Sequence, residues 1–263
     1  MKSYVELARE GPSRGTSGSP ASKDPWGRPF SFATIESIGR GASGMVFDID
    51  ASRVIKVFAG DEGDEKDELK LAREKIFDEL QRHGSQKFTI RYVEGCRSGL
   101  VLERLVGTLR ERLQSFSQKS WEQRSLGSCK GLPSLHEHKG IYGDIGHQNI
   151  LVGDGDHVKL CDFAGSRIGD DAWAPYDIYS QDSSYFRNQP TVATEIFAVG
   201  SLLYKIWNFH RPYRSKKDAV VQKGFHDRAF PLVSIRGLRN KIISKYYDGG
   251  YHSVYSGVWS REQ

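Results

Sequence analysis

Residues 142–151 read Tyr142-Gly143-Asp144-Ile145-Gly146-His147-Gln148-Asn149-Ile150-Leu151. A carboxylate, Asp144, precedes a carboxamide, Asn149, and an apolar run follows them. A second carboxylate, Asp162, ends the β-like run over residues 158–162. In metal-assisted phosphoryl transfer, one group orients the attacking hydroxyl and two oxygen ligands hold Mg²⁺ on the phosphates. The three side chains therefore predict that chemistry, provided that the rest of the chain supplies a nucleotide site.

The composition is that of a globular protein. The 263 residues are 38% hydrophobic, enough for one large domain or two lobes. No run approaches the roughly 18 apolar residues of a membrane span, and the N-terminus lacks the apolar stretch of a secretory signal. Three widely spaced cysteines form neither a zinc pattern nor a disulfide framework: Cys96, Cys129 and Cys161. We therefore expect an intracellular protein, cytoplasmic or nuclear.

The net charge of +5 is spread over acidic and basic runs alike. This distribution favours a solvated surface over a nucleic-acid-binding face. We expect no nucleic-acid partner and no membrane partner, and we assume a monomer.

The first ordered segment surrounds a glycine run. Residues 1–30 are rich in Gly, Ser and Pro and predict a disordered leader. Residues 34–38 and 45–49 predict two strands around Gly39-Arg40-Gly41-Ala42-Ser43-Gly44. Glycines at this spacing let backbone N–H groups approach phosphate oxygens. The strand that follows, in place of a helix, argues against a Rossmann dinucleotide site. A glycine-rich hairpin turn without a ligand is the alternative.

A lysine and a glutamate extend this candidate nucleotide site. Residues 53–58 predict a third strand, in which Lys56 is a lone cation among apolar residues. The charged stretch 61–83 predicts a helix ended by Gly84. Glu74 lies at the border of its apolar face, where it either reaches Lys56 or stays solvated, and Glu68 is a second candidate partner. Residues 88–93 and 99–103 complete five strands.

The remainder of the chain has a helical character. Residues 108–116 and 120–138 predict helices, with Pro133 a kink inside the second. A short strand pair is expected at 149–152 and 157–160, and an irregular, functional loop at 162–194. Residues 195–209 predict a helix buried on all sides, and residues 216–263 two or three short helices.

In their order and spacing these motifs resemble the eukaryotic protein kinase family over roughly residues 32–255. Residues 39–46 are similar to its phosphate loop, and Arg53-Val54-Ile55-Lys56 stands where the family has Val-Ala-Ile-Lys. Residues 102–105 look like the gatekeeper and hinge, residues 142–149 like the catalytic loop, and Asp162-Phe163-Ala164 like Asp-Phe-Gly. The Gly-Asp-Ile-Gly loop at residues 143–146 resembles the corresponding loop of a divergent fungal group of Ser/Thr protein-kinase-like proteins.

The resemblance implies an α+β, bilobal protein-kinase-like fold over residues 31–263. Its N-lobe, residues 31–104, would hold a five-stranded antiparallel sheet and one helix. Its C-lobe, residues 105–263, would be mainly helical, with residues 195–200 resembling the start of its central helix.

The resemblance also implies that the chain uses Mg²⁺ and transfers the γ-phosphate of ATP to Ser/Thr hydroxyls of a protein substrate. Lys56 would pair with the α- and β-phosphates, Asp144 would orient the hydroxyl, and the metal ligands would be Asn149 and Asp162. The implied ATP-binding residues are Ile38, Gly39, Gly41, Gly44, Val46, Val54, Lys56, Glu74, Glu103, Leu105 and Leu151.

Several positions depart from the family pattern. Gly143 replaces an Arg that usually clamps a phosphate on the activation loop, and Gly146 replaces a Lys that helps to neutralise the γ-phosphate. Ala164 replaces Gly, and no Ala-Pro-Glu precedes Glu195. One alternative is therefore a pseudokinase that binds ATP as an interaction module. A second is a small-molecule phosphotransferase, because aminoglycoside and choline kinases have a similar Gly-Asp-x-x-x-x-Asn loop.

Overall fold

The computed structural model describes residues 37–41, 43–58, 64–82, 84, 87–96, 99–112, 127, 129–154, 157–168, 191–231 and 238–254, without the side chains of 64–72, 96, 112 and 238. The predicted leader and residues 34–36 of the first predicted strand lie outside these ranges. The chain divides into two compact units. Unit 1 holds the described residues up to Phe77 and those from Ile90 to Leu105, and unit 2 holds the others.

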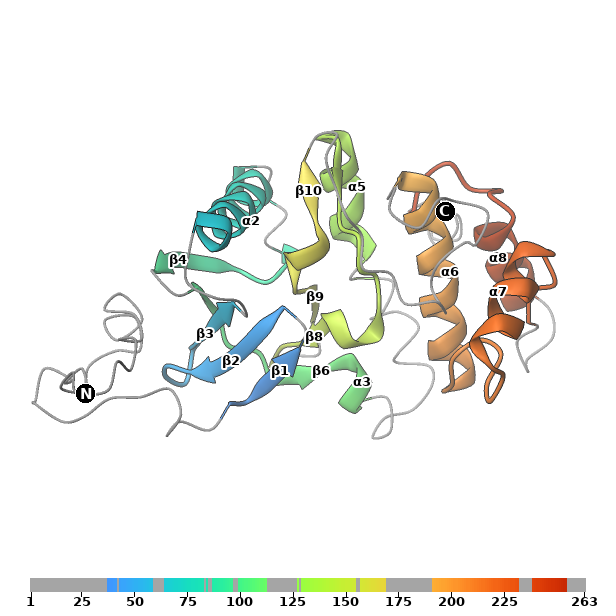
Figure 1. The fold of residues 1–263 in the computed structure, drawn as a ribbon, viewed down its shortest axis with the longest axis horizontal. Helices are drawn as coiled ribbons and strands as arrows, with labels where there is room; N and C mark the ends of the chain where they lie inside the picture. The colour runs from blue at the N-terminus through green and yellow to red at the C-terminus, as the bar shows by residue number, and fades with distance from the viewer. Residues whose placement is uncertain are drawn as a thin grey trace, which may run out of the picture. The chain divides into compact units, whose positions relative to one another are not determined.

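Unit 1 is built on one five-stranded antiparallel sheet (Figure 1). The strand order is β1-β2-β3-β5-β4. The strands are β1 (Gly39–Gly41), β2 (Gly44–Asp48), β3 (Arg53–Phe58), β4 (Tyr92–Cys96) and β5 (Gly99–Glu103). The five-stranded antiparallel sheet predicted from the sequence is confirmed.

The two faces of this sheet differ because alternate residues of a strand point in opposite directions. Phe47 and Ile55 are buried on one face. The other face carries Lys56 and Phe58 of β3, and the helix α2 (Asp64–Arg82) packs on it. The Arg73 guanidinium of α2 lies 4.2 Å from the centre of the Phe58 ring. Gly84, with a φ of 69°, follows the last turn of α2, as predicted.

Two strand predictions in unit 1 were wrong in their bounds. The fourth strand begins at Tyr92 and not at residue 88, because Thr89 belongs to unit 2 and forms a bridge there with Leu160. The first described strand lies on the glycine run itself, where Gly41 pairs with Gly44. Residues 37–38 of the predicted strand are not in a strand, and the strand on residues 39–41 was missed because glycine has little strand propensity.

Unit 2 is mainly helical, with two small sheets. Within the described ranges its α-helices are α3 (Leu109–Arg112), α5 (Leu132–Glu137), α6 (Val192–Asn208), α7 (Asp218–His226) and α8 (Leu238–Tyr247). Three 3-10 turns accompany them: η3 (Cys129–Gly131), η4 (His147–Asn149) and η6 (Phe163–Gly165). One small sheet has the strand order β6-β8-β9, with β6 (Gly107–Thr108), β8 (Ile150–Val152) and β9 (Val158–Leu160). The other pairs β7 (Gly140–Ile141) with β10 (Arg167–Ile168). The predicted pair 149–152 and 157–160 corresponds to β8 and β9.

Pro133 starts a helix and does not kink one. A 3-10 turn ends at Gly131, and Pro133 lies in the first turn of α5. The N–H groups of a first helical turn have no intrahelical acceptor, so a proline there costs no hydrogen bond. The predicted kink is therefore wrong, and the chain changes helix type before the proline.

Helix α6 is the core of unit 2. Every residue from Thr194 to Trp207 is buried. Figure 1 shows α8 beside α6, and the Phe197 ring of α6 lies 4.7 Å from the ring of Tyr247 on α8. A second ring, Phe225 of α7, lies 5.0 Å from Phe197. Aromatic pairs of this kind contribute about 0.5–1.5 kcal/mol beyond their buried area.

A threonine pair sets the start of α6. The Thr194 N–H donates to Oγ1 of Thr191 (3.2 Å), and the Thr191 N–H donates to Oγ1 of Thr194 (2.9 Å). The predicted start at Glu195 was late, because this box lacks the usual Glu or Gln at its third position. The box also fixes where the first turn of α6 places Glu195.

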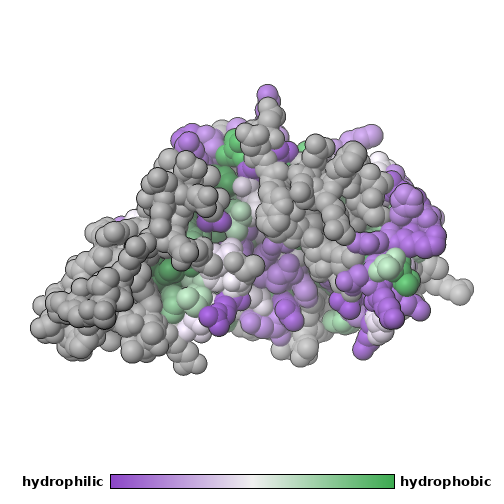
Figure 2. Space-filling model, viewed as in Figure 1, coloured by the Kyte–Doolittle hydropathy of each residue, from purple (hydrophilic) through white to green (hydrophobic). Residues whose placement is uncertain are grey.

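The surface around α7 is mostly polar. Figure 2 shows hydrophilic side chains gathered over this part of unit 2. Val220 of α7 is 48% exposed. Among the helices within the described ranges, none has the length and hydropathy that a bilayer span requires.

We expect Thr191→Ala to lower the free energy of unfolding by about 1 kcal/mol, because one N–H of the first turn loses its side-chain acceptor. Urea unfolding followed by circular dichroism measures the change. Thr191→Ser, which keeps the hydroxyl, serves as the control and should stay close to wild type. Equal losses in both variants would contradict the role of the cap.

Candidate active site

Asp144 and Asn149 lie at the two ends of one short turn in unit 2. The Nδ2 atom of Asn149 donates to the Asp144 backbone oxygen (2.9 Å) and to its Oδ2 atom (2.7 Å). Asn149 is only 6% exposed, and its own N–H donates to the Gly146 carbonyl (3.0 Å). The carboxamide therefore holds the Asp144 carboxylate in one orientation and directs its own Oδ1 atom elsewhere.

Asp162 is placed by an unusual backbone conformation. Its φ of 57° and ψ of 73° are left-handed, and Oδ1 accepts the Ala164 N–H (3.2 Å). An Asp tolerates this region better than most residues, because its short polar side chain bonds to nearby backbone. Phe163 next to it is buried, with its ring edge-on to Tyr142 at 5.2 Å.

Tyr142 links the two acidic segments. Its hydroxyl donates to the Cys161 carbonyl, and its own carbonyl accepts the Ser166 hydroxyl (2.6 Å). Burial is the main cause that raises the pKa of Tyr142 well above its usual value. The phenol therefore stays protonated and remains a donor at any physiological pH.

The donor set suits Mg²⁺ better than a transition metal. Oxygen atoms of Asn149 and Asp162 are the ligands that hard cations prefer. Within the described ranges, no three His, Cys, Asp or Glu side chains gather as a metal cluster. Mg²⁺ commonly takes one or two carboxylates and completes its shell with phosphates and water. The chemistry of the two residues therefore fits that ion.

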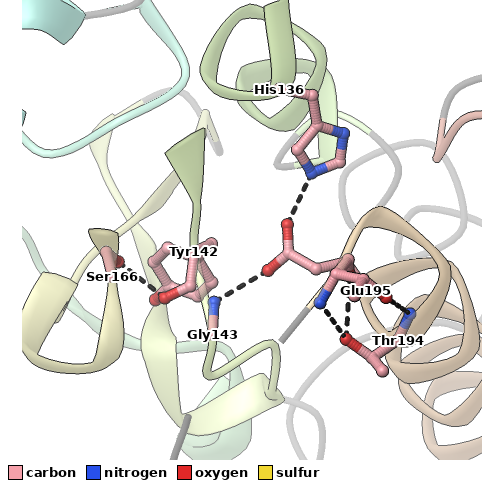
Figure 3. A network of polar contacts seen from close by, with 7 residues as sticks. His136, Tyr142, Gly143, Ser166, Thr194 and Glu195 are labelled. Carbon is pink, nitrogen blue, oxygen red and sulfur yellow. Dashed lines mark hydrogen bonds and ion pairs between the residues drawn. The ribbon is translucent and has the colours of Figure 1, made fainter. Parts of the chain in front are cut away.

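A buried carboxyl group holds the segment before Asp144 (Figure 3). Glu195 of α6 is fully buried, and its Oε1 accepts the Gly143 N–H at 2.8 Å. Its Oε2 lies 2.6 Å from Nε2 of His136 at the end of α5. Burial of a polar group is costly unless it is hydrogen-bonded, and both carboxyl oxygens are. The core helix thereby fixes the backbone next to Asp144.

Sequence reasoning missed this network. Glu195 was expected only to begin the central helix, and His136 was assigned no role. Their 59-residue separation hides the pair from any local pattern. The available signal was an acidic residue at the start of an otherwise apolar helix, which the helix dipole alone also explains.

Gly143 has a conformational reason to be glycine. Its φ is 84°, in a region that L side chains rarely adopt. Any side chain there, including the Arg of the family pattern, would carry a strain of about 1 kcal/mol or more. Its N–H, bonded to Glu195, and its φ together shape the turn into Asp144.

Lys56 and Glu74 lie on the same face of the unit 1 sheet. Lys56 of β3 pairs with Leu100 of β5, which pairs in turn with Gly95 of β4. A Cβ atom on Gly95 would lie 2.9 Å from Cδ of Glu74, so Glu74 covers β4 on the face to which Lys56 points. Lys56 is 9% exposed. The predicted Lys56–Glu74 ion pair stays a prediction, and the Glu68 side chain lies outside the described residues.

The glycine run forms a hairpin in which the three glycines differ. Gly44 has a φ of 148°, and a Cβ atom there would lie 3.0 Å from Cα of Phe58, so the sheet itself requires glycine. A Cβ on Gly39 would make an ordinary contact with Val46 at 3.6 Å, and one on Gly41 would meet nothing within 4 Å. The fold therefore gives no steric reason for glycine at position 41, and the predicted phosphate contact of Gly41 stays a prediction.

The remaining predicted nucleotide-binding residues lie on separate elements. In unit 1, Val46 pairs with Lys56, and Val54 of β3 is 6% exposed. Ile38, before β1, is 51% exposed. Glu103 ends β5 and accepts the Arg91 N–H with Oε1 at 2.7 Å, and Leu105 follows it. Leu151 lies in β8 of unit 2.

We expect Glu195→Ala to lower the free energy of unfolding by about 2–4 kcal/mol, because two buried polar partners each lose a hydrogen bond. Glu195→Gln keeps an oxygen for the Gly143 N–H and should lose less. A double-mutant cycle with His136→Ala, measured in urea, gives the coupling between the two side chains. A coupling indistinguishable from zero would contradict the network.

We expect Gly143→Ala to cost about 1 kcal/mol of folding stability, because alanine is strained at a positive φ. Thermal and urea unfolding both report the loss. Gly41→Ala is the matched control, since Gly41 has no positive φ and an added Cβ meets nothing. If the two substitutions were equally costly, backbone strain would not explain Gly143.

Comparison with known proteins agrees with this geometry. The chain is similar to the serine/threonine-protein kinase RUNKEL of Arabidopsis thaliana (27% identity over 74% of this chain and 15% of that protein). It is also similar to the MAP kinase kinase MKK1/SSP32 of Saccharomyces cerevisiae (27% over 71% and 41%). A third relative is the serine/threonine-protein kinase TAO1-B of Xenopus laevis (27% over 59% and 18%).

The matched region covers well under half of each of these three relatives. They come from a plant, a yeast and a frog, so the fungal group suggested by the Gly-Asp-Ile-Gly loop stays a prediction. A family model of the protein kinase domain matches residues 32–246, which is most of the chain. Together with the antiparallel sheet and the Asp144–Asn149 turn, this match shows that the chain belongs to the protein kinase family.

Proposed function

We propose that this chain is an active protein kinase that transfers the γ-phosphate of ATP to Ser/Thr hydroxyls of a protein substrate. The observation that carries the proposal is the double hydrogen bond from Asn149 Nδ2 to the backbone and carboxylate of Asp144. It fixes the group that must receive or orient the substrate proton. Several relatives are named serine/threonine-protein kinases, which supports the choice of hydroxyl acceptor.

The proposed reaction is an in-line displacement. The substrate hydroxyl oxygen forms a bond to the γ-phosphorus, and the bond between that phosphorus and the bridging oxygen breaks. The electron pair of the broken bond leaves on ADP. The hydroxyl proton passes to the carboxylate of Asp144. Mg²⁺, held by Asn149 and Asp162, would supply charge neutralisation on the phosphates.

Residues of unit 1 would bind the nucleotide. The N–H groups around Gly41 would reach phosphate oxygens, and Lys56 would pair with the α- and β-phosphates. Lys56 is almost completely buried, so an ion pair with phosphate would be little screened by solvent. Val46 and Val54 would provide apolar contacts for adenine.

We further propose an intracellular site of action. Neither Cys129 nor Cys161 is part of a disulfide bond. Free cysteines without a disulfide framework are typical of reducing compartments.

One observation favours a pseudokinase as the second candidate. Residues 143–149 contain neither Lys nor Arg, so this loop brings no permanent positive charge to the transferring phosphate. Lost charge stabilisation can cost several kcal/mol of barrier. A pseudokinase would bind Mg²⁺-ATP without turnover. The metabolite phosphotransferase is not favoured, because the match over residues 32–246 is to the protein kinase domain.

We expect Asp144→Asn to lower phosphoryl transfer by about 100-fold or more, because the proton acceptor is lost while its shape is kept. Incorporation of labelled phosphate into protein or into the chain itself measures the rate. Thermal stabilisation by Mg²⁺-ATP should remain in Asp144→Asn and should be lost in Lys56→Met. Wild-type protein that is stabilised by Mg²⁺-ATP but labels nothing would establish the pseudokinase instead.

A further inference from the structure

The side chain of Gln148 occupies the space beside Gly146. A Cβ atom on Gly146 would lie 2.6 Å from Cδ of Gln148, and both terminal atoms of the carboxamide would be closer still. The backbone of Gly146 is extended, with φ −161° and ψ 158°, a conformation open to any residue. The torsion angles therefore do not require glycine at position 146, and the Gln148 carboxamide lies where a Cβ of residue 146 would be.

The turn that carries Gln148 is firmly held. Gln148 lies in η4, between Asp144 and Asn149. The Asn149 N–H donates to the Gly146 carbonyl, and Nδ2 of the same residue donates to the Asp144 carbonyl. Ile145 anchors the same segment with a side chain that is 2% exposed. The backbone that carries Gln148 is thus held in the same turn as the candidate proton acceptor.

His147 sets the orientation of this carboxamide. Its Nδ1 atom lies 3.0 Å from Oε1 of Gln148. When the ring donates this hydrogen bond, the amide oxygen is engaged and the two Nε2 protons point away from it. Gln148 is partly exposed, so a bound ligand can reach these protons.

The chemistry of the site calls for such a donor. Charge spreads over the equatorial oxygens of a phosphoryl group in transfer, and preorganised N–H donors stabilise that charge. Residues 143–149 carry no Lys or Arg that would do so. The side-chain amides of this segment belong to Gln148 and Asn149, and Asn149 donates to Asp144.

We propose that Gln148, folded over Gly146 and oriented by His147, donates a hydrogen bond to the phosphoryl group during its transfer, as a neutral substitute for a cation in this loop. The inference rests on the proposed kinase function and names a catalytic residue within it. A neutral donor stabilises a charged oxygen less than an ammonium group does. The loop would therefore catalyse transfer with a weaker but already oriented contact.

The test compares four variants by their kcat for labelled ATP, alongside their KM and unfolding midpoint. Gln148→Ala and Gln148→Glu remove the donor and should lower kcat by about 100-fold, the lower end of the range for loss of one preorganised donor. The KM for ATP and the unfolding midpoint should stay near wild type. Gly146→Lys should be impaired in the presence of Gln148, because its side chain collides with the carboxamide. The double variant Gly146→Lys/Gln148→Ala, which frees that space for an ammonium group, should recover activity relative to Gln148→Ala.

A kcat of Gln148→Ala within twofold of an active wild type would overturn the inference and leave the kinase function intact. Loss of kcat together with a lowered unfolding midpoint in both Gln148 variants would assign Gln148 a structural role, which also overturns it. A wild type without turnover would overturn the kinase function itself. In that case the Gln148 side-chain amide signal in a ¹H–¹⁵N spectrum still decides the contact. A shift on addition of Mg²⁺-ATP is expected, and an unchanged signal would reject the contact.

Discussion

The candidate site depends on the two hydrogen bonds of the buried Glu195 carboxyl group. This group joins the most deeply buried helix of unit 2 to the backbone that leads into Asp144, through the Gly143 N–H and His136. A loop fixed only by its own turns would leave Asp144 free to shift, and catalysis tolerates little displacement. Here the rigidity of α6, begun by its threonine cap, reaches Asp144 through a single buried side chain.

Gly143 and Gly146, which replace an Arg and a Lys of the family pattern, have different surroundings in the structure. Gly143 adopts a φ of 84°, which suits glycine and would strain the arginine of the family pattern. Gly146 has an ordinary backbone and instead leaves the space that Gln148 fills. The backbone thus favours glycine at position 143, whereas at position 146 it is the neighbouring Gln148 carboxamide that uses the space.

The sequence predicted those parts of the fold that local patterns determine. Strand β5 matched its predicted bounds, and α6 followed from its continuous apolar run. The two-residue strands β7 and β10 carry no periodicity, and they form only because Arg167 meets Ile141 across the loop. The Asp144–Asn149 spacing was readable because both residues lie in one turn. The partnership of Glu195 with His136 was not, because it arises from tertiary packing and has no local signal.

The charge distribution of the site has a further consequence. Residues 143–149 contain no lysine or arginine, so in the proposed kinase reaction neutralisation of the phosphates would fall to Lys56 and to Mg²⁺ held by Asn149 and Asp162. Hydrogen-bond donors fixed in advance need no reorganisation when charge develops, so their value rests on rigidity more than on charge. In a loop without cations, transition-state stabilisation therefore depends more on rigidity than it does in a loop with cations. This accounts for a site in which a fully buried carboxyl group and a 6%-exposed carboxamide are present, while the family's Arg and Lys are replaced by Gly143 and Gly146.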